Sequence, residues 1–215
     1  MKRLFDIVAS LTGLFLLAPV FAVAACAVLF ASGRPIFFRQ QRIGRNFHPF
    51  SIYKFRTMVA DAPQRGGPLT TGGDSRVTRV GAVLRKLKID ELPQLVNVLK
   101  GDMSVVGPRP EVPEYVDRFQ PDYEVILQIR PGITDLASLK YADEAGLLSN
   151  FENPQEAYIR QVLPDKIRLA REYLRRSSLI FDIHVILKTL LKLTHLTGSP
   201  KDLHGTEIHM SRTAR

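Results

Sequence analysis

Asp90 and Glu91 are adjacent residues whose carboxylate side chains could take part in a reaction. Basic residues precede them along the chain, and Pro93 stiffens the backbone that presents them. A carboxylate held near positive charge stays ionised, as a nucleophile or a ligand of Mg²⁺ must be, and Mg²⁺ favours one or two carboxylates together with phosphate oxygens and water. The pair therefore predicts chemistry on a phosphorylated substrate.

A structural explanation competes with this interpretation. An aspartate at the start of a helix is often only an N-cap, and a glutamate in the first turn is often only a favourable surface residue.

Two short amphipathic helices are predicted around the carboxylates. Apolar residues from Val80 to Leu87 recur at helical spacing and leave arginines and lysines on the opposite face. The same spacing recurs from Leu92 to Leu99, so we expect a second helix to begin near Asp90 and to end at a glycine cap, Gly101.

A hairpin and a turn-rich loop should precede these helices. Ile36 to Arg42 and Phe50 to Arg56 are rich in aromatic and β-branched residues and flank Gly44-Arg45-Asn46, which predicts a β-hairpin. Ala60 to Asp74 has turn composition without periodicity and predicts a loop that could close over a substrate or serve only as a connector. Further along, Gly107-Pro108-Arg109-Pro110 predicts a stiff turn that holds one arginine in place.

The C-terminal part is predicted to be helical and then irregular. Asp165 to Arg176 has a charged amphipathic pattern, which Ser177-Ser178 interrupts and which resumes from Leu179 to Leu196. These helices could pack on the domain or lie flat on lipid. From Gly198 on, the chain is polar and irregular, as disordered tails are.

The N-terminal segment has the composition of a membrane helix. From Ile7 to Ala31 it carries no charge, and a straight helix of this length would be about 37 Å long, enough for the ~30 Å of hydrocarbon in a bilayer. Basic residues flank both ends, which favours the cytoplasmic side for both, and Pro19 should bend the helix. A simple span and a re-entrant hairpin both remain open. A cleaved signal peptide is disfavoured, because apolar residues continue past Cys26 and Asp6 interrupts the start.

Composition limits the partners. The 215 residues fit one domain with a core, and a net charge of +9 predicts anionic partners such as phospholipid headgroups, nucleotides or nucleic acid. Nothing resembles a nucleic-acid-binding motif, so nucleic acid is not expected. The single cysteine excludes a disulfide within one chain, and the histidines are too scattered to suggest a metal site. The oligomeric state is open, and a homodimer is compatible with the sequence.

Several motifs follow one another in a distinctive order. They are Lys54-Phe55-Arg56-Thr57-Met58, Asp90-Glu91-Leu92-Pro93-Gln94-Leu95, Asn97-Val98-Leu99-Lys100-Gly101-Asp102-Met103-Ser104, Val106-Gly107-Pro108-Arg109-Pro110 and Arg130-Pro131-Gly132-Ile133-Thr134. Together they resemble the bacterial sugar transferase family, the small monotopic polyprenyl-phosphate phosphoglycosyl transferases. The likeness runs from the N-terminal segment to about Leu196, and we expect no added N-terminal domain.

The resemblance implies an α+β, mostly helical fold with a re-entrant N-terminal membrane helix, a small β-hairpin and amphipathic interfacial helices. The re-entrant helix would occupy residues 1–34, broken at Ala18-Pro19. A catalytic domain would occupy residues 35–197 on the cytoplasmic face of the bacterial inner membrane, and a polar tail residues 198–215.

The resemblance also implies a reaction. The family moves a phospho-sugar from a UDP-sugar to a polyprenyl phosphate with the help of Mg²⁺ and releases UMP. Undecaprenyl phosphate is the expected bacterial carrier. Such a step would begin the assembly of exopolysaccharide, of the O-antigen of lipopolysaccharide or of a glycoprotein glycan.

The family's acidic pair matches Asp90 and Glu91. By resemblance, Asp90 would attack the β-phosphorus of the donor to form a covalent phospho-sugar enzyme and would contact Mg²⁺, while Glu91 would orient the nucleophile or assist with the metal or a proton. Lys54 and Asp182 match family positions near the site, although they could also be a solvated strand lysine and a helix-surface aspartate. Arg109 is either a phosphate clamp or a brace for its own loop.

The chain departs from the family pattern after Gly132-Ile133-Thr134. Many relatives continue with Gly-Leu-Ala-Gln and an Asn-Gly-Arg, whereas this chain continues with Asp135-Leu136-Ala137-Ser138. Lys140 or Arg130 could replace the missing arginine as a substrate contact, and the sugar is not indicated. Two other functions stay open, a membrane-bound metal-dependent phosphohydrolase and a non-enzymatic basic protein that binds membrane or nucleic acid.

Overall fold

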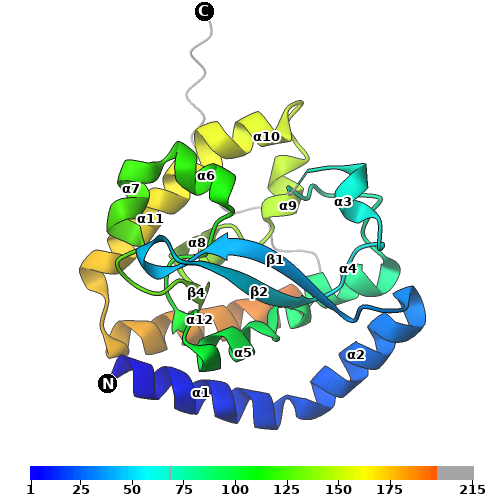
Figure 1. Cartoon of the computed structure of the whole chain (residues 1–215), viewed down its shortest axis with the longest axis horizontal. Coiled ribbons are helices and arrows are strands. Elements are labelled where there is room, and N and C mark those ends of the chain that lie inside the picture. Colours follow the sequence, from blue (N-terminus) through cyan, green and yellow to red (C-terminus); the bar gives the residue numbers. More distant parts are fainter. Residues whose placement is uncertain (68, 198–215) are drawn as a thin grey trace, which may run out of the picture.

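The structure is a computed structural model that describes residues 1–67 and 69–197. Its fold is the predicted one, mostly helical α+β with a bent N-terminal helix pair and a small antiparallel hairpin (Figure 1). The expected polar tail, residues 198–215, lies outside the described residues.

The N-terminal pair consists of α1 (Lys2–Leu16) and α2 (Ala18–Ser32), which run along one side of the molecule (Figure 1). The axis bends by 63° between them, next to Pro19, whose ring cannot continue the hydrogen-bond ladder. Among the described residues no single helix is long and apolar enough to cross a bilayer, whereas the bent pair meets that test together, as a broken span or a re-entrant loop does.

Polar groups of α1 tie the pair to the rest of the chain. The Asp6 carboxylate is buried and accepts hydrogen bonds from the Ser104 hydroxyl at 2.9 Å and from the Val105 amide at 3.0 Å. The Arg3 guanidinium donates to backbone carbonyls of residues 98 and 99. A charge that would be costly in lipid is thus satisfied against the protein.

The predicted hairpin is confirmed. Strand β1 (Phe37–Ile43) pairs antiparallel with β2 (Pro49–Phe55), and a 3₁₀ turn (Arg45–Phe47) joins them. The loop that follows contains one short helix, α3 (Ala62–Arg65), that its composition did not indicate.

The helices around the carboxylates differ from the prediction at one boundary. Helix α4 (Arg79–Lys86) forms as expected, but Asp90 and Glu91 lie in a separate 3₁₀ turn (Ile89–Glu91), and α5 (Gln94–Lys100) begins only after Pro93. Pro93 occupies the N-cap of α5, where its missing amide costs nothing. Gly101 ends the helix with φ of 93°, as predicted.

The described elements after α5 are helices apart from two short parallel strands, β3 (Ser104–Val106) and β4 (Gly132–Thr134). The predicted C-terminal helices are confirmed as α11 (Leu163–Arg176) and α12 (Leu179–Thr197), which are separated by Ser177-Ser178. The elements after β3 are α6 (Pro113–Arg118), α7 (Gln120–Ile126), α8 (Leu136–Lys140), α9 (Glu144–Leu148), α10 (Pro154–Ala157), a π-helical turn (Tyr158–Val162), α11 (Leu163–Arg176) and α12 (Leu179–Thr197).

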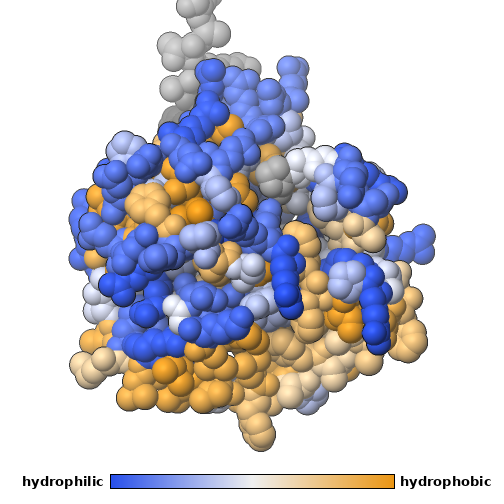
Figure 2. All heavy atoms as spheres, viewed as in Figure 1, coloured by the Kyte–Doolittle hydropathy of each residue, from blue (hydrophilic) through white to orange (hydrophobic). Residues whose placement is uncertain are grey.

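One small core cluster links the apolar helix pair to the rest of the fold. Ala24 and Val28 of α2 are buried against Phe55 of β2 and Leu84 of α4. Figure 2 shows apolar residues gathered over α1 and α2, with the polar surface above them. Strand β2, which carries Lys54, and helix α4, which precedes the acidic turn, are therefore packed directly on the apolar segment.

Candidate active site

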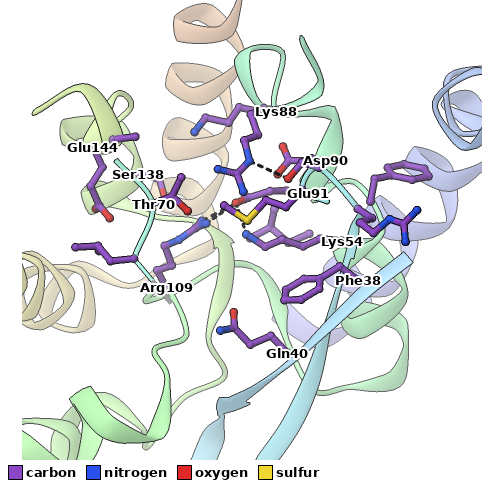
Figure 3. A pocket seen from close by; sticks show the side chains of 18 of the residues that line it. Phe38, Gln40, Lys54, Thr70, Lys88, Asp90, Glu91, Arg109, Ser138 and Glu144 are labelled. Carbon is purple, nitrogen blue, oxygen red and sulfur yellow. Dashed lines mark hydrogen bonds and ion pairs between the residues drawn. The ribbon is translucent and has the colours of Figure 1, made fainter. Parts of the chain in front are cut away.

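A cleft of about 2370 Å³ brings most of the predicted site residues together. Lys54 of β2, Asp90 and Glu91 of the 3₁₀ turn, and Arg109 all line it, and their side chains converge in its centre (Figure 3). The loop after β2, the segment from α8 to α9 and the end of α12 complete the walls.

The turn that carries the carboxylates depends on an unusual backbone conformation. Lys88 has φ of 56° and ψ of 18°, in the left-handed region that a residue with a side chain rarely adopts. The backbone changes direction at Lys88, between α4 and the 3₁₀ turn. The side chains of Asp90 and Glu91 therefore line the cleft.

Glu91 forms ion pairs with two cations of the site, Lys54 and Arg109. The Lys54 ammonium donates to Glu91 Oε1 at 2.9 Å, and the Arg109 guanidinium holds both carboxylate oxygens, with Nη1 3.1 Å from Oε2. Burial acts to raise the pKa of Glu91, but the charges and hydrogen bonds of Arg109 and Lys54 outweigh it and hold that pKa well below its usual range. Glu91 is therefore a fixed anion.

Asp90 has a different environment from its neighbour. It is buried, and its Oδ1 has no hydrogen-bond partner in the described part of the chain. Burial and the adjacent Glu91 charge raise the pKa of Asp90, although Lys54, Arg85 and Lys88 oppose the change. The sequence places basic residues near both carboxylates. In the structure the hydrogen bonds of Lys54 and Arg109 go to Glu91, whereas Asp90 Oδ1 has no partner among the described residues.

Arg85 is a functional candidate that the sequence reasoning did not single out. It lies in the cleft, where its Nε donates to the Thr57 hydroxyl at 2.8 Å. Helix α4 can approach Thr57 this closely because Gly81 has no side chain; a Cβ at Gly81 would lie 2.0 Å from the Thr57 carbonyl oxygen. The signal was present in the sequence, since Arg85 belongs to the basic face predicted for this helix.

Asp135 is a second residue that the sequence reasoning missed. Its Oδ2 accepts a hydrogen bond from the Arg109 amide at 3.1 Å, and its Oδ1 caps α8 by accepting from the Ser138 amide at 2.7 Å. Asp135 is almost fully buried. It therefore fixes the backbone of the loop that presents Arg109.

Two predicted substrate-binding residues do not lie in the cleft. The Asp182 carboxylate is buried, pairs with Lys2 and accepts a hydrogen bond from the Tyr173 hydroxyl at 2.6 Å, so it joins α12 to α1 and α11. Arg130 donates to the Gly101 carbonyl at 2.8 Å and supports the end of α5. Lys140, offered as a replacement for the family arginine, pairs with Asp165 at 2.8 Å instead. Each of the three residues therefore makes a contact within the fold and lies outside the lining of the cleft.

The site fits Mg²⁺ only if the protein supplies very few of its ligands. The described residues contain no group of three or more histidine, cysteine, aspartate or glutamate side chains that could enclose a metal. Both Glu91 oxygens are held by cations, which leaves the Asp90 Oδ1 as a ligand that the protein can offer. Mg²⁺ accepts one carboxylate when phosphate oxygens and water complete its shell, so Asp90 with a diphosphate is a suitable donor set.

Relatives of the chain carry names that describe sugar phosphate transfer. It is 38% identical over 202 residues to the UDP-N-acetylgalactosamine-undecaprenyl-phosphate N-acetylgalactosaminephosphotransferase of Aeromonas hydrophila, an alignment that covers 92% of this chain and 44% of that protein. It is 40% identical over 197 residues to the UDP-glucose:undecaprenyl-phosphate glucose-1-phosphate transferase of Caulobacter vibrioides, covering 89% of this chain and 69% of the relative.

The chain thus spans less than half of the Aeromonas protein and about two thirds of the Caulobacter protein. A third relative matches over almost its whole length: the exopolysaccharide production protein PSS of Rhizobium leguminosarum bv. phaseoli is 36% identical over 200 residues, which cover 89% of this chain and 94% of the relative.

A family model described as bacterial sugar transferase matches residues 1–195, and this range includes the bent helix pair, the hairpin, the acidic turn and every described wall of the cleft. The chain belongs to the bacterial sugar transferase family.

Proposed function

We propose that the chain transfers a sugar 1-phosphate from a UDP-sugar to undecaprenyl phosphate, through a covalent intermediate on Asp90, and releases UMP. The observation that carries this proposal is the pair of unlike carboxylates in the cleft: Glu91 fixed by two cations, and Asp90 buried with an oxygen that has no partner among the described residues. The names of the relatives supply the donor and acceptor classes.

In the first step, an ionised oxygen of Asp90 attacks the β-phosphorus of the donor. A carboxylate–phosphorus bond forms, the bond from the β-phosphorus to the bridging oxygen breaks, and its electron pair leaves with UMP. Phosphoryl transfer depends mainly on positioning and on neutralising charge. Lys54, Arg85 and Arg109 line the cleft and supply that charge, with Arg109 suited to bind two phosphate oxygens at once.

In the second step, a phosphate oxygen of the polyprenyl carrier attacks the same phosphorus. The Asp90 carboxylate leaves, and a polyprenyl diphosphate sugar forms. The two-step route lets one site handle a soluble donor and a lipid acceptor in turn. The cleft reaches Arg34 and Pro35, just after the apolar helix α2, so the acceptor's phosphate can approach from the side of the bent pair.

Mg²⁺ belongs to this proposal as a bound cofactor. When bound, it would neutralise charge on the diphosphate and on the leaving UMP. Asp90 would hold it. The proposal also puts the protein at the bacterial inner membrane with its catalytic domain on the cytoplasmic face, and the lipid acceptor named for the relatives and the bent apolar helix pair support a membrane location.

The test is to incubate the purified protein in nanodiscs with Mg²⁺ and a panel of UDP-sugars, with and without undecaprenyl phosphate. We expect UMP release that requires the lipid for turnover. With donor alone, intact-protein mass spectrometry should show one added sugar phosphate, which Asp90→Asn abolishes. Asp122→Asn is a matched control, because Asp122 pairs with Arg171 at 2.6 Å outside the cleft. Free sugar phosphate without lipid and without an adduct would indicate a phosphohydrolase and refute the proposal.

A further inference from the structure

The cleft holds a second group of charged and aromatic side chains, away from the acidic pair. We call it the charge-balanced cluster. Its members are Arg42, Glu111, Tyr115, Glu144, Tyr158 and Lys166, all of which line the cleft. Figure 3 shows Glu144 across the cleft from Asp90, and the Arg109 head lies between them in that view. The negative charges of Glu91 and Glu144 both act to raise the pKa of Arg109, so Arg109 lies near both carboxylates.

Close contacts hold the charge-balanced cluster together. The Lys166 ammonium pairs with Glu144 and lies 3.8 Å from Glu111 Oε1. The Tyr158 hydroxyl donates to Glu111 Oε1 at 2.9 Å, and Arg42 Nη1 lies 3.6 Å from Glu111 Oε2. Glu111 and Lys166 are 6% and 9% exposed, so the cluster is a built feature of the cleft wall and not a solvated surface.

The balance of charge separates this cluster from the acidic pair. Two cations, Arg42 and Lys166, face two carboxylates, Glu111 and Glu144, so the cluster offers no net attraction to an anion. Around the acidic pair, in contrast, the cations Lys54, Arg85, Lys88 and Arg109 outnumber the carboxylates. A diphosphate is drawn to the cationic end, and the uncharged part of the donor is left for the charge-balanced cluster.

Two buried donors in the cluster are not used by the protein. Arg42 Nε and the Tyr115 hydroxyl have no hydrogen-bond partner in the part of the chain that the structure describes. Tyr115 is 3% exposed and packs against Tyr158 with ring centroids 5.0 Å apart. Buried polar groups nearly always have a partner, so these two are suited to a ligand.

A sugar ring matches this chemistry. Its hydroxyl groups both donate and accept, so they can pair with carboxylates on one side and with guanidinium, ammonium and phenol groups on the other. Ligand sites of this kind fix orientation with a few placed polar groups against apolar and aromatic walls. A uracil ring, which offers no row of hydroxyls, makes little use of two carboxylates.

We propose that the charge-balanced cluster binds the sugar that the donor carries and selects among sugars, with Glu144 as a specificity-determining residue. Glu144 is the more exposed carboxylate of the cluster, 29% against 7% for Glu111, so a ligand in the cleft reaches it more readily. This inference rests on the proposed function, because it takes a UDP-sugar as the ligand. The ribose of the donor has the same hydroxyl chemistry, and the test separates the two.

The test compares UDP with a panel of UDP-sugars by isothermal titration calorimetry in detergent micelles. All proteins carry Asp90→Asn, which prevents a covalent adduct. Adding Glu144→Gln should leave UDP affinity within about twofold and lower the affinity for the preferred UDP-sugar about tenfold, as the loss of one charge-assisted hydrogen bond does. Glu156→Gln is the matched control, since Glu156 pairs with Arg160 at 2.9 Å on an exposed helix.

Tyr115→Phe provides a second variant if the glutamine variant folds poorly. It removes only a hydroxyl that has no partner in the described structure, so it should preserve the fold and again weaken UDP-sugar more than UDP. Equal losses for UDP and UDP-sugars would assign the cluster to the ribose, and unchanged affinities would remove it from the site; either result overturns the inference. Failure of the proposed function appears differently, as wild-type protein that binds UDP-sugars selectively and releases no UMP.

Discussion

Replacing Glu91 by glutamine tests whether the buried ion pairs of Glu91 stabilise the fold. Glu91 is 13% exposed and pairs with Lys54 and Arg109, which would be left facing one another without an anion. Removing one partner of a buried ion pair costs about 3–5 kcal/mol. Because the Arg109 side chain is 31% exposed and regains some solvation, we expect the lower end, about 3 kcal/mol of unfolding free energy.

The assay is thermal unfolding followed by circular dichroism at 222 nm in detergent micelles. For a chain of this size, a loss of about 3 kcal/mol corresponds to a Tm about 6–12 °C lower. Glu172→Gln is the matched control, because Glu172 also faces two arginines, Arg168 and Arg176, yet on an exposed helix where all these side chains are 33% exposed or more. An exposed i,i+4 pair on a helix is worth about 0.3–0.5 kcal/mol, so losing both pairs costs about 1 kcal/mol at most and this variant should lose less than about 4 °C.

The pH dependence gives an independent check on the same residue. Since the pKa of Glu91 is lowered by folding, its stabilising contribution is complete above the unfolded pKa of about 4.3 and is lost as the pH falls through the lower folded value. The gap in Tm between wild type and Glu91→Gln should therefore be constant between about pH 5 and 7 and narrow only below about pH 4. Equal losses for Glu91→Gln and Glu172→Gln, or a gap that closes near neutral pH, would refute this reasoning.

The other predictions concern the remaining buried acids. Asp90→Asn should abolish UMP release and the covalent adduct without lowering the Tm, because burial raises the pKa of Asp90 and already opposes its charge; circular dichroism and intact mass check both parts. For the same reason, the apparent pKa of the acid limb of kcat/KM should lie above the ordinary aspartate pKa of about 3.9. UMP release measured against pH should therefore decrease as the pH drops and Asp90 takes a proton. Asp135→Ala removes the acceptor of the Arg109 amide and should lower kcat/KM about tenfold, whereas Asp135→Asn, which keeps one carbonyl oxygen, should recover part of it. Asp182→Asn weakens the contact with Lys2 and should cost about 1–3 kcal/mol of stability while the KM for the UDP-sugar is unchanged, which a donor titration measures.

Elements set by local signals could be predicted from the sequence. The break before Pro19 follows from the missing proline amide, and the hairpin follows from two β-rich runs around Gly44-Arg45-Asn46. Helices α11 and α12 follow from the spacing of their apolar residues, and Ser177-Ser178 marks the interruption between them. In each case the residues that determine the element lie within the element, so no distant contact is needed.

Contacts between distant segments could not be predicted in this way. Asp182 reads as a helix-surface aspartate, because its partner Lys2 lies at the other end of the chain and only the docking of α1 on α12 brings them together. Asp135 reads as part of an unexplained departure from the family pattern, because nothing in its neighbours indicates that it would meet the Arg109 amide. Both are buried charges whose roles depend on tertiary packing.

The unlike environments of Asp90 and Glu91 follow from the same limit. A 3₁₀ turn has about three residues per turn, so neighbouring side chains leave it about 120° apart and meet different parts of the fold. On one side stand β2 and the proline-flanked loop, which bring Lys54 and Arg109 to Glu91. On the other side Asp90 is buried without a hydrogen-bond partner for Oδ1 among the described residues.

This separation would give the two adjacent acids different roles in the proposed reaction. Environments that push the pKa values of neighbouring acids apart are the usual way in which an active site gives them different roles. Glu91 remains an anion that keeps Lys54 and Arg109 in place before a substrate arrives, while Asp90 retains an uncommitted oxygen. An equal sharing of the cations would instead leave both carboxylates engaged and neither free to attack. In the proposed reaction, the division between a Glu91 anchor and an Asp90 nucleophile therefore rests on the turn and its surroundings and not on the two residue types.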